Sequence, residues 1–187
     1  MYSMKRLSSG FTLIELLIVI AVLGILAVAV LSAINPIEQI NRSRDTGSRS
    51  DAEQLLGAID RFYASQGYYP WKISSTNPVS DDTAWAVVDN STWTDGATAV
   101  LTKLAEAGTG ELKASFTTRI TGVSYNTLYK SNRGTAGDST YVCFLPKSSS
   151  FQTESGTRCG ATLPADYPAG ACPAGCAAAK TCYSCLP

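Results

Sequence analysis

The chain has 187 residues and contains no histidine. Histidine is the usual general base near neutral pH, the common partner of a catalytic serine or cysteine, and the most frequent metal ligand in proteins. Its absence argues against most hydrolase mechanisms before any motif is considered. We therefore expect no catalytic residue and no cofactor.

A charge excess of either sign is also missing, since 15 basic residues balance 15 acidic ones. Binding to nucleic acid depends on a basic excess that gathers on one face and neutralises phosphates. Nucleic acid is therefore not expected as the main partner.

The mean hydropathy of +0.04 is an average over two unlike regions. Residues 1–10 carry Lys5 and Arg6 without an acid, and they precede a mostly apolar run of 24 residues, Phe11–Ile34. As a helix this run would extend about 36 Å, more than the roughly 30 Å of a bilayer hydrocarbon core. The sequence predicts a membrane helix over residues 11–35 whose basic end stays in the cytoplasm.

One acidic residue, Glu15, interrupts the apolar run. An ionised carboxylate near the bilayer centre costs roughly 2.5–3.5 kcal/mol on insertion scales, so an acid in this place is by default a functional hypothesis. We expect a cation from a neighbouring molecule to compensate its charge.

Gly10 is followed by the residues FTLIELLIVI, and this motif resembles the processing signature of type IV prepilins and the related pseudopilins. The resemblance implies that a membrane prepilin peptidase removes residues 1–10 as a leader and methylates Phe11, the new N-terminus. It also implies that Glu15 pairs with the Phe11 amine of an adjacent subunit. Breaking such a pair would leave an uncompensated buried charge, which typically costs about 3–5 kcal/mol.

Two plainer interpretations of the N-terminal segment are an ordinary secretory signal and a single-span anchor. Small residues that end at Ala29 or Ala33 could form a signal cleavage site. An acid inside the apolar region argues against a secretory signal, and an anchor would leave Glu15 without a role.

Two positions could interrupt the long helix. Gly24 lies in its middle, where glycine costs around 1 kcal/mol relative to alanine, and close helix packing or local unwinding would account for it. Type IV pilins often carry a proline eight residues after this glycine, whereas this chain has Ser32 there and its first proline at Pro36. The position of a helix break therefore stays open.

Residues 36–70 are predicted to form the second half of the long helix. The polar stretch 41–51 is expected to be a solvated neck in which three arginines pair locally with two aspartates, namely Arg42, Arg44 and Arg49 with Asp45 and Asp51.

At the end of this neck, Ser50 and Glu53 fit a helix capping box. Gly67 and Pro70 are typical of a helix end. Between them, apolar residues recur at helical spacing on a face expected to cover a small sheet: Ala52, Leu55, Leu56, Ile59, Phe62 and Tyr63.

Residues 71–187 are expected to form a globular head. It should contain a loop region over 71–96, a short helix over 99–104, and three strands, at Ala114–Ile120, Val123–Tyr129 and Thr140–Leu145. The predicted fold class is α+β: a long N-terminal α-helix, with its hydrophobic half protruding, packs on a small antiparallel β-sheet followed by a disulfide-rich C-terminal loop region.

All six cysteines lie in the last 45 residues, with the tail from about residue 159 especially rich in them: Cys143, Cys159, Cys172, Cys176, Cys182 and Cys185. This placement predicts disulfides on the oxidising side of a membrane, but sequence alone does not choose among the pairings. We favour Cys143 with Cys159 and the other four among themselves. The favoured link would contribute about 3 kcal/mol in the chain-entropy model.

A zinc site is the competing interpretation of the last four cysteines. Zinc sites with two cysteine hooks usually separate them by roughly 15 to 20 residues. Only five residues lie between Cys176 and Cys182. The spacing therefore argues against zinc, and we expect no metal. A redox-active pair of Cys182 and Cys185 is disfavoured too, because nothing resembles a thioredoxin-like unit.

The resemblance implies a structural subunit rather than an enzyme. Before assembly the protein would span the cytoplasmic membrane once and contact lipid, the prepilin peptidase and the assembly machinery; afterwards it would form an extracellular filament with copies of itself. The alternatives are a pseudopilin of a type II secretion system and a minor pilin for adhesion or DNA uptake. Loss of Lys5 and Arg6 would leave a net charge of −2, which disfavours strong DNA binding.

Overall fold

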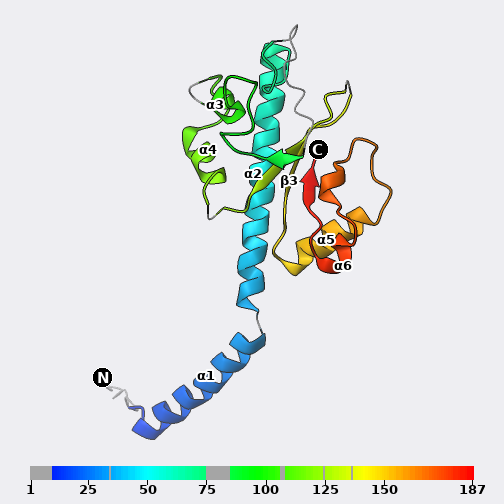
Figure 1. The fold of residues 1–187 in the computed structure, drawn as a ribbon. Helices are drawn as coiled ribbons and strands as arrows, with labels where there is room; N and C mark the ends of the chain where they lie inside the picture. Colours follow the sequence, from blue (N-terminus) through cyan, green and yellow to red (C-terminus); the bar gives the residue numbers. More distant parts are fainter. Residues whose placement is uncertain (1–9, 34, 75–84, 106–107, 124, 136) are drawn as a thin grey trace, which may run out of the picture. The chain divides into compact units, whose positions relative to one another are not determined.

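The computed structural model describes residues 10–33, 35–74, 85–105, 108–123, 125–135 and 137–187 (Figure 1). The chain divides into two compact units, one that ends at Ile37 and one that spans Glu38–Pro187. The first contains helix α1, and the second is the head. Residues 1–9 of the predicted leader lie outside the described residues.

Helix α1, Leu13–Ala33, runs unbroken through Gly24. Ser32 continues it, and its hydroxyl donates a hydrogen bond to the carbonyl of Ala29 at 2.8 Å. The next helix begins at Pro36. Proline is well tolerated as the first residue of a helix, where its missing N–H would have no intrahelical partner. The break that the sequence left open therefore falls between Ala33 and Pro36.

Helix α2, Pro36–Gln66, is continuous through the stretch predicted to be a solvated neck. That prediction is wrong, because Asp45, Ser48 and Asp51 are buried in the head. The capping box predicted at Ser50 is also wrong, since this residue lies inside the helix. The predicted helix end is confirmed: Gly67 follows Gln66 with a φ of 75°, a left-handed conformation that favours glycine.

Four short strands form one antiparallel sheet in the order β1–β2–β3–β4. Their bounds are Ala86–Val87, Leu128–Ser131, Tyr141–Phe144 and Ser184–Leu186. Every residue of β3 is buried, which is expected for a central strand covered on both faces. The α+β fold class is thereby confirmed.

Successive side chains of β3 point to opposite faces of the sheet and enter different clusters. Val142 and Phe144 join the main core, where α2 contributes Ala52, Leu55, Leu56, Ala58, Ile59 and Phe62. Tyr141 and Cys143 join a second cluster with Ala171 and Cys185.

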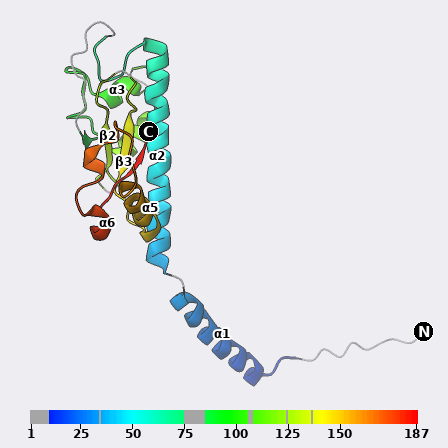
Figure 2. The ribbon, with the colours of Figure 1, turned by 90° about the vertical axis from the view of Figure 1, so that its right-hand side faces the viewer.

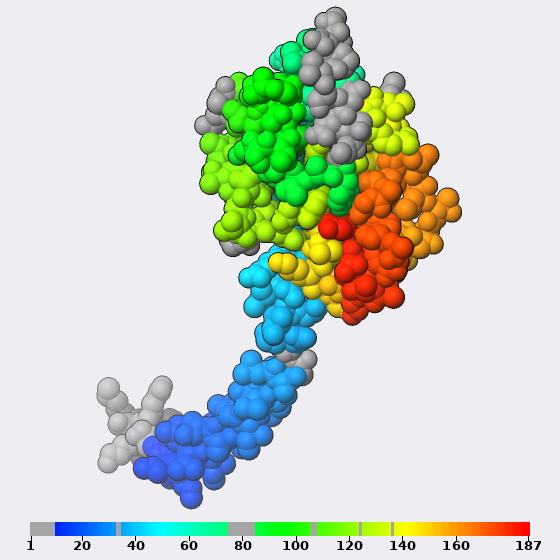
Figure 3. Space-filling model, in the orientation of Figure 1, coloured from blue at the N-terminus to red at the C-terminus, as the bar shows by residue number. Residues whose placement is uncertain are grey.

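The C-terminal segment covers this second face (orange and red in Figures 1 and 3). It contains α5, Ser149–Cys159, then the 3₁₀ turn η1, Ala169–Ala171, then α6, Cys176–Ala179, before the chain returns as β4. The predicted loop region is thus partly regular structure.

Two of the predicted elements are confirmed and two need correction. The helix at 99–104 is α3, Val100–Leu104, and the strand at Thr140–Leu145 is β3. Ala114–Ile120 is not a strand but helix α4, because burial of Phe116 and Ile120 follows the i, i+4 helical spacing. The strand predicted at Val123–Tyr129 is displaced, since β2 begins only at Leu128.

The cysteines form three disulfides: Cys143–Cys185, Cys159–Cys172 and Cys176–Cys182. The favoured pairing of Cys143 with Cys159 is therefore wrong. Strand β4 pairs antiparallel with β3 and sets Cys185 directly opposite Cys143. Strand β4 was not predicted, because a three-residue strand has too few positions to show an alternating pattern.

Candidate functional site

The described segment before α1 is short and exposed. Gly10, Phe11 and Thr12 have non-helical backbone, and the Phe11 side chain is 85% exposed. A Cβ atom built on Gly10 would meet no other atom within 4 Å. The described residues on either side of the bond after Gly10 are therefore exposed.

The apolar surface of helix α1 is exposed in the described part of the chain. All of its large apolar residues up to Leu31 are exposed, with exposed fractions of 47% or more. Residues Leu13–Ser32 have a mean hydropathy of 3.1, and by length and composition they could cross a membrane. An apolar surface of this extent marks a membrane or protein contact.

Glu15 is held at the start of α1 by Thr12. The backbone N–H and the hydroxyl of Thr12 each donate a hydrogen bond to Glu15 Oε2 at 2.8 Å, and the Glu15 N–H donates to the Thr12 hydroxyl oxygen at 3.3 Å. This is a capping box of the type T-x-x-E. This capping box was not predicted, although Thr12 stands three residues before Glu15 in the sequence.

The capping box leaves one carboxylate oxygen available. Both bonds from Thr12 reach Oε2, and within the described residues Glu15 Oε1 accepts no hydrogen bond. The carboxylate can therefore keep its local bonds and accept another from a second molecule.

The N-terminal segment is similar to that of known proteins. Residues 5–31 match the family described as the prokaryotic N-terminal methylation motif. The chain is type IV pilin-like. It is 39% identical over 67 residues to the "Fimbrial protein EcpC" of Eikenella corrodens. That match covers 36% of the pilin-like chain and 42% of the fimbrial protein. No solved structure gives a significant match.

In the head of the pilin-like chain, α2 caps the start of α5. The Asp45 carboxylate accepts the backbone N–H groups of Lys147 at 3.0 Å and of Ser148 at 2.7 Å, together with the Ser148 hydroxyl at 2.6 Å. Glu38 Oε1 accepts the N–H of Ser149 at 2.8 Å. Ser149 is the first residue of α5, and Lys147 and Ser148 directly precede it, so none of their N–H groups has an intrahelical partner. The two carboxylates accept these N–H groups and face the positive end of the helix dipole.

Two further contacts attach the polar part of α2 to the head. Asp51 accepts hydrogen bonds from the Arg119 guanidinium and the Tyr125 hydroxyl. Burial and the bond to Asp51 raise the pKa of Tyr125 above its usual value. Arg49 donates to Glu154 at 2.7 Å.

These contacts correct the prediction of local ion pairs within the neck. The aspartates bind groups about 70 and 100 residues away along the chain. A signal was present: positions 45, 48, 52, 55 and 59 recur at helical spacing, so the buried stripe of α2 continues into the polar stretch.

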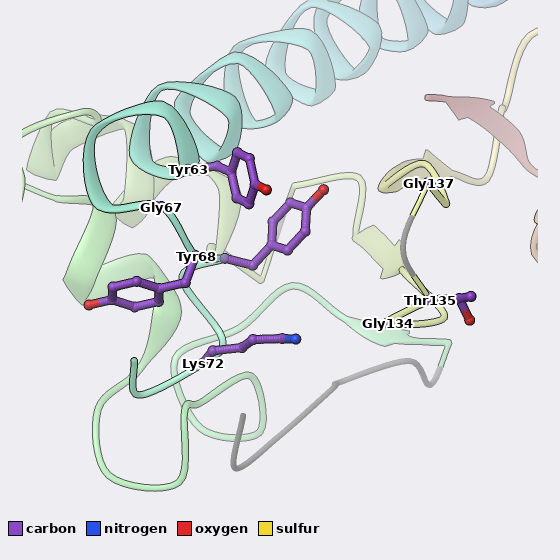
Figure 4. A pocket seen from close by; sticks show the side chains of 8 residues that line it. Tyr63, Gly67, Tyr68, Lys72, Gly134, Thr135 and Gly137 are labelled. Carbon is purple, nitrogen blue, oxygen red and sulfur yellow. The ribbon is translucent and has the colours of Figure 1, made fainter. Parts of the chain in front are cut away.

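A pocket of about 310 Å³ lies near the C-terminal end of α2 (Figure 4). Its described lining includes Tyr63, Tyr68 and Tyr69, with Lys72 extending toward the turn at Gly134 and Thr135. Burial raises the pKa of Tyr69. These groups offer hydroxyls and an ammonium but no carboxylate, so they form no carboxylate-based acid–base pair.

The sulfur atoms of Cys159, Cys176 and Cys182 lie within 4.8 Å of one another. All six cysteines are nevertheless in disulfides, so no thiolate is available in this structure. Two disulfides would have to be reduced before these atoms could bind zinc.

Proposed function

We propose that the protein is the structural subunit of a type IV pilus-like extracellular filament. The observation that carries this proposal is the coincidence of the methylation motif over residues 5–31 with a helix whose apolar side chains are all exposed. Such a helix needs lipid or other apolar helices around it, and a subunit that leaves the membrane to join a filament meets both in turn.

Processing after Gly10 would create the charge that assembly uses. Cleavage there frees an amine at Phe11, which the prepilin peptidase would then methylate. The basic residues of the leader favour a cytoplasmic N-terminus before cleavage, with a single span of the membrane.

Assembly would bring this amine to Glu15 of a neighbouring subunit. The carboxylate offers Oε1 to the incoming cation while Oε2 keeps its bonds to Thr12. An ion pair of this kind stabilises two groups that are each costly alone in apolar surroundings. It would therefore favour subunits in the correct register and leave misplaced ones with unpaired charges.

The head supports an extracellular destination. Three disulfides tie its C-terminal segment together, and such bonds persist in oxidising compartments. Cross-links of this kind would also strengthen a subunit that is exposed to shear, which favours a surface pilus over the shorter periplasmic filament of a pseudopilin. Filaments that electron microscopy finds beyond the cell envelope would agree with this choice, and filaments confined to the periplasm would favour the pseudopilin.

The experiment that tests processing is a mass measurement on the protein from the membrane fraction. We expect an N-terminal peptide that begins with methylated Phe11 and an intact mass lower by residues 1–10. A soluble chain trimmed beyond Ala29 would contradict the proposal, because it would lack α1.

A further inference from the structure

A second pocket of the head, of about 360 Å³, lies along the N-terminal half of α2. Figure 2 shows α5 beside this part of the helix. Residues of α2 and α4 and of the segments before β2 and α5 line the pocket, and its volume is typical of small-molecule sites. We call it the basic pocket, because its described lining has three cations and one acid: Arg44, Arg119, Lys147 and Asp51.

The positive charge of the basic pocket exceeds what the acids around it compensate. Asp51 binds the Arg119 guanidinium and the Tyr125 hydroxyl. Asp45 does not line the pocket, and its carboxylate accepts the N–H groups at the start of α5. Three cations against one lining carboxylate therefore leave a formal charge of +2.

Most of the donors that these cations carry are available. The side chains of Arg44 and Lys147 are exposed, and within the described residues neither makes a hydrogen bond or an ion pair. Arg119 donates to Asp51 through Nη1, and its other two nitrogens donate no hydrogen bond to the described part of the chain. A guanidinium has five N–H donors, so Arg119 can keep its bond to Asp51 and bind a ligand as well.

Gly47 keeps space open on the α2 side of the basic pocket. It lies inside the helix, where glycine is a poor helix former. Its φ is not positive, and a Cβ atom built on it would meet no other atom within 4 Å. Neither backbone conformation nor close packing within the chain requires glycine here, whereas a ligand in the pocket would use the space that a side chain would fill.

We propose that the basic pocket binds a phosphate group, carried by inorganic phosphate or by the headgroup of an anionic phospholipid. A guanidinium matches two oxygens of a phosphate with parallel N–H groups, and a lysine ammonium adds a point charge. A phosphate offers enough oxygens for three cations, whereas a carboxylate has only two. The site lies in the head of a single chain, so it requires no neighbouring subunit and is independent of the proposed function.

Acetylation of lysine amines tests the site on the full chain in detergent micelles. A bound phosphate should protect the Lys147 amine from an N-hydroxysuccinimide ester of acetate. Its labelling rate should fall about fivefold in about 20 mM phosphate relative to chloride of equal ionic strength, which corresponds to a Kd of about 5 mM. Lys113 and Lys180 are internal controls, since both are exposed and lie outside the pocket. Mass spectrometry of the peptides gives all three rates.

A pair of variants tests whether the pocket itself binds the phosphate. Arg44→Gln removes one cation and keeps Lys147 as the reporter, so the Kd should rise about tenfold and the protection should be lost. The head should still fold, because the exposed Arg44 side chain makes no bond within the described residues. Arg42→Gln is the matched control: this exposed arginine lies outside the pocket, about 200° around the helix from Arg44, and its loss should leave the protection unchanged.

Reconstitution into vesicles without added phosphate distinguishes the two sources of the phosphate group. Protection of Lys147 in phosphatidylglycerol vesicles but not in phosphatidylcholine vesicles would assign the lipid headgroup. Protection by inorganic phosphate alone would assign the soluble anion.

Several results would overturn the site. One is equal labelling of Lys147 in chloride, in phosphate and in phosphatidylglycerol vesicles. Equal protection of Lys113 and Lys180, or an equal loss of protection in Arg42→Gln, would show a general salt effect instead of a pocket. Protection by double-stranded DNA alone would indicate a surface for a polyanion. None of these results bears on filament assembly, because the labelling is done on dispersed chains.

Discussion

Helices α1 and α2 follow each other in sequence and use their surfaces in opposite ways. α1 is apolar on every side and buries none of it within the chain. α2 begins with a polar stretch, yet Asp45, Ser48 and Asp51 in that stretch are buried. Among the described residues, the large apolar side chains of α1 are exposed, whereas the buried aspartates of α2 bind groups in distant parts of the head. Hydropathy alone would predict that α1 is buried and that the polar start of α2 is exposed, and both predictions would be wrong for this chain.

The largest effect is expected from a change that keeps α1 in its precursor form. Gly10→Val adds a branched side chain where the protease must approach, so processing should stop. The intact mass of the membrane-bound protein would then be that of the precursor. A chain that still begins at Phe11 would show that the residue before the cut does not control cleavage.

Glu15→Leu removes the only acid of α1 and should leave membrane insertion intact or improved, because an ionised carboxylate opposes insertion. Filament yield should fall sharply, since the amine of the neighbouring subunit loses its partner. Membrane fractionation and counting of sheared filaments measure the two effects. Normal filaments would refute the pairing role.

Thr12→Ala separates the two roles of Glu15. It removes the capping hydroxyl while leaving the carboxylate for a neighbouring amine, and loss of such a cap costs about 1 kcal/mol. Filaments should therefore form, at a modestly reduced yield. A loss as large as that of Glu15→Leu would mean that Glu15 acts mainly on its own helix.

The corresponding test for α2 measures the free energy of unfolding of the head. Asp45→Ala leaves the N–H groups of Lys147 and Ser148 without their acceptor, and the free energy of unfolding should fall by about 3 kcal/mol. Thermal unfolding of the full chain in detergent micelles measures this change. The exposed Asp60 provides the control, because Asp60→Ala should change the value by less than about 0.5 kcal/mol.

The smallest effect concerns acid stability and involves Asp95. Burial alone would raise its pKa, but Lys103 at 2.7 Å and the N–H groups of Thr98 and Ala97 lower it below the usual value of 3.8. A carboxylate with a lowered pKa in the folded state stabilises the protein above its unfolded pKa and ceases to do so as the pH falls. Stability should thus decrease below pH 3.8. Asp95→Asn should flatten this decrease in denaturant titrations across the acid range.

The sequence was most informative where one physical requirement dominates. The apolar run predicted α1, and the strand-forming residues of Thr140–Leu145 predicted β3. It was least informative where distant segments decide the structure. Ala114–Ile120 became a helix through burial of Phe116 and Ile120, and the partner of Cys143 depended on where β4 returned.

The candidate site also contains residues that could be predicted from the sequence and residues that could not. Gly10, Phe11 and Glu15 could be nominated from the sequence because they lie in one contiguous motif, within the residues 5–31 that match the family, and their roles stay predictions. The carboxylates that cap α5 could not, since Asp45 and Ser148 are about 100 residues apart and acquire their relation only in the folded head.

The capping of α5 by α2 has a mechanical consequence. Tension on α1 reaches the head through the first turns of α2, where Glu38 and Asp45 hold the start of α5. The far end of α5 is anchored covalently by Cys159, and the neighbouring sheet by Cys143–Cys185. A force on α1 is thus distributed over several hydrogen bonds before it reaches the disulfides. The bonds between the start of α2 and the start of α5 should therefore break before the sheet unfolds.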